Sequence, residues 1–361
     1  MKFPYGEANF EKIRSEGYFY VDKTRYIELL EHLQASHVVM LRSRRFGKTL
    51  FINMLGYYYD QLRADKFDAL FDGLYIHSDP TPKRGSYMVL TFNFSGINTE
   101  TLKNANAGFI DEIRSSVALF LERYHHHFLE TEKQNILQPQ TSNGIIANLF
   151  KILSRKESGK CVYVLIDEYD HLANNILSQG KEMFKDLVRT DGYVRPFYEA
   201  LKVGTETVVD RMFITGVMPI LLDSLTSGFN IGMNISTEEK FNEMFGFTEE
   251  EITPILEYLG TETRRERLRT YYDGYRFSPK ARKRLYNSDM ILFYALKYEP
   301  ETDYIESMID TNVVSDYRKI RAILSIGDRD LEEAILTRIV GVCAGVSQRS
   351  LREEGQGSAH S

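Results

Sequence analysis

Three consecutive residues, Gly47, Lys48 and Thr49, have the side-chain chemistry and the order needed to bind a phosphate group. A glycine lets the backbone approach a phosphate, a lysine adds a positive charge, and a threonine hydroxyl can hold Mg²⁺. The triplet follows a short apolar run, Val38 to Leu41, and precedes an apolar stretch that starts at Leu50. This order predicts a buried strand, a phosphate loop and the first turn of a helix, whose unpaired amides attract anions.

Arginines precede this triplet in an unusual way. The standard loop pattern, G-x-x-x-x-G-K-[ST], has a glycine where this chain has Arg42, and Arg44 and Arg45 follow. Two interpretations are open. The arginines could replace the lost backbone contacts by charge-assisted hydrogen bonds to phosphate, or they could pair with acidic residues on neighbouring turns. Arg45, close to the glycine, is the strongest phosphate-binding candidate of the three.

Two acidic residues, Asp167 and Glu168, directly follow the unbroken apolar run Val162 to Ile166. Such a run is typical of a central parallel strand that is buried on both faces. Hydrolysis of ATP needs one carboxylate to orient the Mg²⁺ shell and a second to position or polarise the attacking water, and this pair fits both roles. Acidic residues also favour a helix N-terminus, which is the alternative interpretation. The loop upstream favours the nucleotide site.

Thr215 lies at the end of another predicted core strand, which begins at Arg211. Its hydroxyl could contact the γ-phosphate or the attacking water, or it could bond its own turn. Asp170 is predicted to cap the helix that starts at His171. Three arginines are candidates for a finger that contacts the transferred phosphate, and the sequence does not choose between Arg189, Arg195 and Arg211.

Together these residues predict a site for ATP and Mg²⁺. We expect catalysis to depend on Lys48, Asp167 and Glu168, with the metal held by Thr49 and Asp167. The residues expected to contact the nucleotide are Arg44, Arg45, Phe46, Gly47, Lys48, Thr49, Leu50 and Thr215. ATP binding with Mg²⁺-dependent hydrolysis is the first hypothesis. A nucleotide-gated switch with little turnover, or a DNA-associated module, is the alternative.

Apolar periodicity places these residues on an alternating series of strands and helices. Strands are expected at 18–21, 38–41, 86–94, 162–166 and 211–216, and helices after residue 24 and at 48–62, 107–124 and 144–153. Strands separated by helices indicate an α/β fold with a mainly parallel central sheet flanked by helices. From about residue 241 the chain is charge-rich and helical, which predicts a smaller domain packed on the sheet.

The composition limits the class of protein. The 361 residues are 43% hydrophobic and 27% charged, which allows a sizeable core and about two domains. The net charge of −6 gives no overall sign of DNA binding, so the basic clusters at 264–269 and 280–284 are either solvated faces or a local patch. The two cysteines, Cys161 and Cys343, lack metal-ligand spacing, which suits a reducing compartment. Without a secretory signal or an apolar run of about 20 residues, we expect a cytoplasmic protein with no membrane partner.

Six segments resemble, in this order, the prokaryotic AAA-ATPase-like family: 20–24, 44–49, 165–170, 215–220, 223–230 and 272–275. The arginine-rich loop belongs to the pattern of that family, so Arg42 need not indicate a damaged loop. The resemblance implies a P-loop NTPase with one strand inserted between the loop strand and the strand that ends in Asp167 and Glu168. It also implies a C-terminal helical or winged-helix-like domain that acts as a lid.

The resemblance extends to about residue 330 and divides the chain into three parts. We expect a P-loop NTPase domain at 1–240, with 1–36 as an extension packed on it, then a lid domain at 241–340 and a disordered tail at 341–361. Family members usually continue into a nuclease-like domain of the PD-(D/E)xK type. No Asp…Glu-x-Lys pattern follows residue 300, so we expect no nuclease activity from this chain. A homo-oligomer is expected if a neighbouring subunit supplies the arginine finger.

Overall fold

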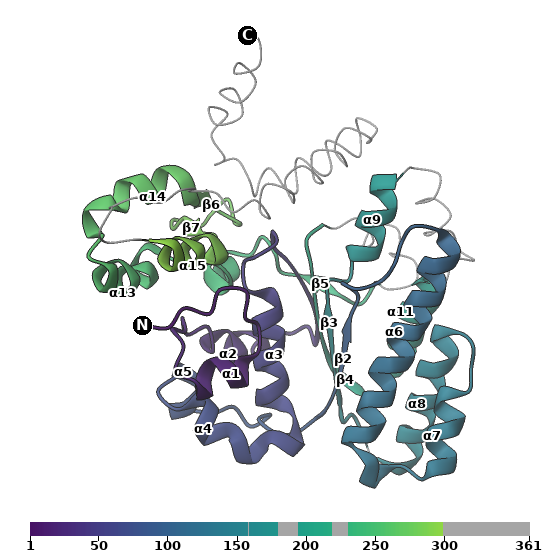
Figure 1. The fold of residues 1–361 in the computed structure, drawn as a ribbon. Helices are drawn as coiled ribbons and strands as arrows, with labels where there is room; N and C mark the ends of the chain where they lie inside the picture. Colours follow the sequence, from purple (N-terminus) through teal and green to yellow (C-terminus); the bar gives the residue numbers. More distant parts are fainter. Residues whose placement is uncertain (158, 180–193, 219–229, 299–361) are drawn as a thin grey trace.

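The computed structural model describes residues 1–157, 159–179, 194–218 and 230–298 (Figure 1). These residues form an α/β fold in which helices flank a five-stranded parallel sheet, so the predicted fold class is confirmed. The strands are β1 (His37–Leu41), β2 (Met88–Asn93), β3 (Val162–Asp167), β4 (Val209–Gly216) and β5 (Met233–Asn234). Their order in the sheet is β2-β3-β4-β1-β5.

β4 lies between β1 and β3, so the strand expected between the loop strand and the acidic strand is present. Leu41 of β1 lies opposite Gly216 of β4, and Ile166 of β3 lies opposite Ile214 of β4. Because the three strands are parallel, their carboxyl ends meet at one edge of the sheet. The residues that follow them therefore come together at that edge, where open α/β sheets bind ligands.

The central strands are apolar on both sides because helices cover both faces of the sheet. One face carries α1 (Phe10–Ser15), α2 (Arg25–Glu31), α3 (Lys48–Tyr59), α4 (Phe67–Phe71) and α5 (Tyr75–Ser78). The other face carries α6 (Leu102–Arg123), α7 (Glu130–Leu137), α8 (Ser142–Lys156), α9 (His171–Gln179) and α11 (Val194–Gly204). Alternate residues of β3 belong to the two cores, with Tyr163 and Leu165 in the first and Val162, Val164 and Ile166 in the second.

Several predicted elements differ from the structure, and the helix predicted at 107–124 starts earlier, at Leu102. The helix predicted at 48–62 ends at Tyr59, because the Asp60 carboxylate accepts a hydrogen bond from the backbone two residues later and starts the 3₁₀ helix η1 (Gln61–Lys66). The strand predicted at 18–21 is wrong, since the only ladder contact described for this segment is an isolated bridge between Lys2 and Tyr18. Its aromatic residues serve core packing instead, as Tyr20 does against the α1–α5 side.

A smaller unit follows the sheet and has an apolar core of its own. It contains α13 (Glu249–Leu259), η4 (Glu262–Arg264), α14 (Arg265–Tyr272), the antiparallel strands β6 (Asp273–Tyr275) and β7 (Leu285–Tyr286), and α15 (Ser288–Lys297). Ile252 and Ile291 lie in this core, and Phe3 and Phe19 of the N-terminal segment pack against it. The 3₁₀ helix η3 (Glu239–Met244) precedes this unit and packs against the core on the α1–α5 side of the sheet. One further short 3₁₀ helix, η2 (His125–His127), follows α6.

Three basic residues of the two clusters, Arg265, Arg269 and Lys283, are paired with carboxylates of the same unit. Arg265 and Arg269 both pair with Glu249, at 2.7 and 3.2 Å, and Lys283 pairs with Glu250 at 3.3 Å. These pairs neutralise part of the charge that DNA would need, and the choice between solvated faces and a DNA-binding patch stays a prediction.

Several expectations fall outside the described residues. They include Arg189, the greater part of the segment 223–230, and the expected tail at 341–361. Within the described ranges, no helix is both long enough and apolar enough to cross a membrane.

Candidate functional site

The loop between β1 and α3 ends in a glycine with a left-handed backbone. Gly47 is in the left-handed region, with φ of 89°, and a Cβ added there would meet no atom within 4 Å. α3 begins at the next residue, and no described side chain caps its first amides. The first turn of α3 therefore directs N–H groups and the positive end of the helix dipole at an open space.

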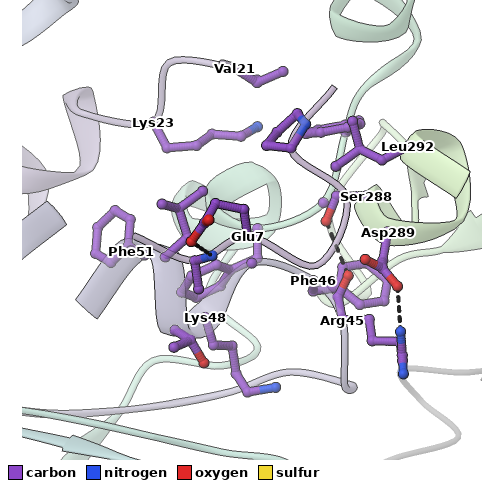
Figure 2. Close-up of a pocket in the computed structure, with 18 of the residues that line it drawn as sticks. Glu7, Val21, Lys23, Arg45, Phe46, Lys48, Phe51, Ser288, Asp289 and Leu292 are labelled. Atoms are coloured by element: carbon purple, nitrogen blue, oxygen red, sulfur yellow. Dashed lines mark hydrogen bonds and ion pairs between the residues drawn. The ribbon is translucent and has the colours of Figure 1, made fainter. Parts of the chain in front are cut away.

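A cavity of about 480 Å³ opens at this end of α3. Lys48 lies at one end of it and Val21 lies far away at the other (Figure 2). The loop segment 44–50 lines the cavity, and other polar lining residues lie outside the loop: Glu7, Lys23, Glu168, His171, Ser288 and Asp289. The apolar part includes Phe19, Val21, Phe247 and Leu292. Pockets of this size bury small organic ligands, and this one has both charged and apolar side chains in its lining.

One hydrogen-bonded network joins the helix start to two strand ends. Thr49 Oγ1 donates to Asp167 Oδ2 at 2.7 Å, and Thr215 Oγ1 donates to Asp167 Oδ1 at 2.6 Å. Asp167 and Thr215 are both buried, so the carboxylate is fixed on both oxygens. Thr215 does not bond its own turn, because β4 lies directly beside β3 and offers it the carboxylate. The contact predicted between Thr215 and the nucleotide stays a prediction.

Lys48 is buried against the loop that precedes it. Its Nζ donates to the carbonyl oxygens of Arg42 and Ser43, each at 3.1 Å. Burial lowers the pKa of this amine, and the negative charges of Asp167 and Glu168 oppose that shift. An ammonium group that is desolvated and held by neutral carbonyls gains strongly from an anionic ligand.

Glu168 follows β3 in a left-handed backbone conformation, with φ of 51°, which is uncommon for a residue with a Cβ. Its Oε2 lies 3.0 Å from Nδ1 of His171, and both residues line the cavity. Burial alone raises the pKa of Glu168, but His171, Lys48 and Arg44 outweigh burial and lower it. The group is therefore a carboxylate at neutral pH, which is the form that can polarise a water molecule.

Arg42 fastens the loop to the segment that follows β5. Its buried guanidinium donates, at 2.7 to 2.8 Å, to the backbone carbonyl oxygens of Leu41, Ser236 and Phe241. It also lies 4.2 Å from the centre of the Phe277 ring. Burial lowers the pKa of Arg42 to about 9. Among the described residues, the partners of Arg42 are thus neutral carbonyls and an aromatic ring. The sequence suggested either phosphate or acidic residues as partners of the arginines, and neither describes these contacts.

The next residues of the loop are held by the C-terminal unit. Arg45 Nη1 pairs with Asp289 Oδ2 at 2.5 Å, across 244 positions of sequence. Phe46 is buried against the rings of Tyr275 and Phe277, with centroids 4.8 and 5.2 Å away. Arg45 therefore has an acidic partner, as one interpretation expects, but on a distant element instead of a neighbouring turn. A contact between Arg45 and phosphate stays a prediction.

Asp170 precedes α9 and ties that helix to the segment after β4. Its carboxylate accepts hydrogen bonds from the backbone amides of Val217, at 3.0 Å, and Met218, at 2.6 Å. It also accepts one from the side chain of Asn174 at 2.7 Å. The predicted helix cap does not include the contacts with Val217 and Met218, because these residues lie 47 and 48 positions away in sequence.

The three arginines considered as fingers lie in different settings. Arg211 is buried and donates to the carbonyl of Leu30 at 3.1 Å, so it is unsuited to reach a neighbouring subunit. Arg195 pairs with Glu199, four residues along α11, at 2.9 Å. Arg189 lies outside the described residues.

Two side chains of the site, His171 and Asp289, were not identified from the sequence. His171 lies three residues after Glu168, where helical spacing could have suggested the contact. Asp289 contacts Arg45 from a separate unit, and no local pattern could have revealed it.

A family profile described as "Predicted AAA-ATPase" matches residues 4–226. The chain belongs to the AAA-ATPase-like family. The matched region contains all four longer strands of the sheet, the loop between β1 and α3, and Asp167, Glu168 and Thr215. The resemblance inferred from the sequence motifs is thereby confirmed.

This AAA-ATPase-like chain is also similar to a longer protein, "Uncharacterized protein in vnfD 5'region", from Azotobacter chroococcum mcd 1. The two are 28% identical over 325 residues, which cover 89% of this chain and 57% of the relative. The chain thus spans little more than half the length of the curated relative that it matches. No solved structure matches this family member.

Proposed function

We propose that this AAA-ATPase-like protein binds ATP and hydrolyses it with Mg²⁺. The contact between Thr49, at the start of α3, and Asp167, at the end of β3, carries the proposal. It brings a hydroxyl and a carboxylate within 2.7 Å of each other beside a glycine loop and a buried lysine. Oxygen ligands of these two kinds, next to bound phosphates, are what Mg²⁺ prefers.

These residues fit Mg²⁺ without a cage made of protein alone. Mg²⁺ usually keeps several waters and binds one or two protein groups together with phosphate oxygens. In the part of the chain that the structure describes, no three His, Cys, Asp or Glu side chains cluster as a metal site. Thr49 and Asp167 would therefore hold the ion together with the nucleotide. When bound, Mg²⁺ neutralises charge on the β- and γ-phosphates.

The other groups of the site have separable roles in this proposal. The amides at the start of α3 and the ammonium of Lys48 bind the phosphates. Glu168 orients and polarises the attacking water, and Thr215 keeps Asp167 in place. The apolar lining that includes Phe19 and Phe247 suits the flat base, which makes the C-terminal unit a lid over the nucleotide.

Calorimetric titration with MgATP tests the binding part of the proposal. Lys48→Ala should abolish detectable binding, because it removes the buried cation that faces the phosphates. Lys83→Ala is the matched control, since Lys83 pairs with Asp210, away from the cavity, and its loss should leave the affinity unchanged. Equal affinities of wild type and Lys48→Ala would refute the assignment.

Steady-state phosphate release tests the hydrolysis part. Glu168→Gln should keep MgATP binding and lose turnover, because the amide retains the size of the side chain but cannot act as a base. Removal of Mg²⁺ with EDTA should abolish turnover in the wild type. Turnover that survives both treatments would assign the chemistry to other groups.

A second candidate function is a nucleotide-gated switch with little turnover. The observation that favours it is the pair formed by Glu168 Oε2 and His171 Nδ1, because this pairing diverts the carboxylate from water. Single-turnover hydrolysis by the isolated chain, with and without DNA, separates the two functions. Rapid hydrolysis without a partner excludes a pure switch, whereas acceleration by DNA that disappears at high salt identifies DNA as the partner.

A further inference from the structure

The start of α15 holds the backbone of the phosphate-type loop. Asn287 Nδ2 donates to the carbonyl oxygen of Arg44 at 3.3 Å. The carbonyl oxygen of Arg45 accepts from Ser288 Oγ at 3.1 Å and from the backbone N–H of Asp289 at 3.3 Å. Three consecutive residues of the C-terminal unit therefore bind two consecutive carbonyls of the loop.

The side chains repeat this connection. The carboxylate of Asp289 pairs with the guanidinium of Arg45 at 2.5 Å, and the two side chains are only 14% and 29% exposed. Figure 2 shows this pair, together with the bond from Ser288 to the Arg45 carbonyl, at one wall of the cavity. Partly buried charge pairs of this kind are less screened by solvent than pairs on the open surface.

The contacts from α15 hold the backbone of Arg45 in an uncommon conformation. Arg45 is left-handed, with φ of 66°, and a residue with a Cβ adopts this conformation only when its surroundings enforce it. The carbonyl bonds from Ser288 and Asp289 are the described contacts that enforce it. Gly47, two residues later, needs its own left-handed geometry to open the loop to the cavity. The shape of the loop thus depends on how α15 is docked.

The charge of Asp289 gives a second reason. A carboxylate in the wall of a cavity that takes a triphosphate repels the ligand unless a cation neutralises it. Arg45 is that cation, so the pair makes this wall acceptable to an anion while it fixes the loop. Loss of Arg45 removes the cation that lies 2.5 Å from this carboxylate, and loss of Asp289 removes the carboxylate that holds the Arg45 guanidinium at the wall.

We propose that Asp289 is a positioning residue of the nucleotide site, which acts through Arg45 to hold the phosphate loop in its binding geometry. The inference rests on the proposed function, since the ligand it concerns is MgATP. It follows that nucleotide affinity depends on the docking of the C-terminal unit, and that whatever moves α15 changes the affinity. Conversely, nucleotide binding stabilises the docked position of α15.

Two measurements test the proposal. The dissociation constant for MgATP reports the ligand, and hydrogen–deuterium exchange of the peptide 42–50 in the nucleotide-free protein reports the loop itself. Asp289→Asn should raise the dissociation constant about tenfold, equivalent to ~1.4 kcal/mol, and should speed exchange in this peptide. Asp289→Glu, which keeps the charge, should recover part of both effects.

A double-mutant cycle separates pairing from general destabilisation. Arg45→Gln should weaken binding more than Asp289→Asn, because it removes positive charge from the cavity wall, whereas Asp289→Asn removes negative charge from it. Arg45→Gln with Asp289→Asn should bind better than Arg45→Gln alone, which shows coupling between the two side chains. If Asp289→Asn does not fold, Arg45→Gln breaks the same pair from the loop side and exchange is compared there.

Glu249→Gln is the matched control. It removes an ion-paired carboxylate from the same unit, but Glu249 contacts Arg265, Arg269 and Tyr286 and does not line the cavity. It should lower the stability of the unit without changing MgATP affinity or exchange at 42–50. Equal effects of Glu249→Gln and Asp289→Asn, or wild-type behaviour of Asp289→Asn, would overturn the proposal.

The two proposals fail in different ways. If the wild type does not bind MgATP, the proposed function is wrong, and the exchange measurement still decides whether Asp289 holds the loop. Equal exchange at 42–50 in wild type and Asp289→Asn would then refute the positioning role as well.

Discussion

The hydrogen bond from Thr215 to Asp167 gives a direct test of how the site is held. Thr215→Val preserves the shape of the side chain and removes the hydroxyl that donates to Oδ1 at 2.6 Å. That oxygen also accepts from the backbone amide of Glu168 at 3.1 Å, so it keeps one of its two described partners. Hydrogen bonds to buried charged groups contribute about 1.5 to 3 kcal/mol. Because Oδ1 keeps one partner, we expect the unfolding free energy to fall by an amount at the lower end of this range, about 1.5 kcal/mol.

The same substitution should affect metal use. Partners that orient a metal ligand typically change metal affinity or activity by about 10- to 100-fold, so the Mg²⁺ concentration for half-maximal hydrolysis should rise at least about tenfold. Thr215→Ser is the control, because it keeps the donor. Urea denaturation followed by circular dichroism gives the stability, since the chain contains no tryptophan for fluorescence. If the Val and Ser variants agree in both stability and Mg²⁺ dependence, Thr215 does not hold Asp167 in the way described.

Three further variants test the loop and the C-terminal unit. Gly47→Ala should weaken MgATP binding by about 1 to 2 kcal/mol in titrations, because a Cβ disfavours the left-handed backbone even where it meets no atom. Arg42→Met should lower the urea-derived unfolding free energy by about 3 kcal/mol, since it leaves buried carbonyls without donors, and a loss below about 1 kcal/mol would contradict this. Burial raises the pKa of Glu249, but Tyr286, Arg265 and Arg269 outweigh burial and hold this pKa below its ordinary value of 4.5. The ionised Glu249 side chain therefore stabilises the folded state above pH 4.5, and this contribution is lost as the pH falls further. The unfolding free energy from urea curves should therefore fall less between pH 7 and acid pH in Glu249→Gln than in the wild type.

The sequence alone determined the chemistry of the site and its local backbone order. The apolar run of β1, the glycine at position 47 and the first turn of α3 are contiguous, so local preference and hydrophobic pattern suffice to predict them. The same holds for β3, which ends at Asp167, and for Glu168 after it. Parallel strands that are buried on both faces also have unbroken apolar sequences, and these allowed the fold class to be predicted.

Local pattern was insufficient where a side chain had several partners within reach. Aromatic residues at 18–21 suggested a strand because β-rich composition does not distinguish sheet pairing from core packing against a helix. The end of α3 was placed too late because Asp60 satisfies a nearby amide and so favours a turn over another helical residue.

Tertiary structure alone decided what the polar side chains do. Thr215 reaches Asp167 because β4 lies between β1 and β3. The sequences of the individual strands do not predict this order. Arg42 bonds carbonyls that lie as far as residue 241, and Arg45 pairs with Asp289. The physical reason is common to these cases, because a charged or hydroxyl group takes whichever partner the packed chain brings to it. Arg42 and Arg45, which the sequence associates with phosphate, therefore connect the loop to distant parts of the chain.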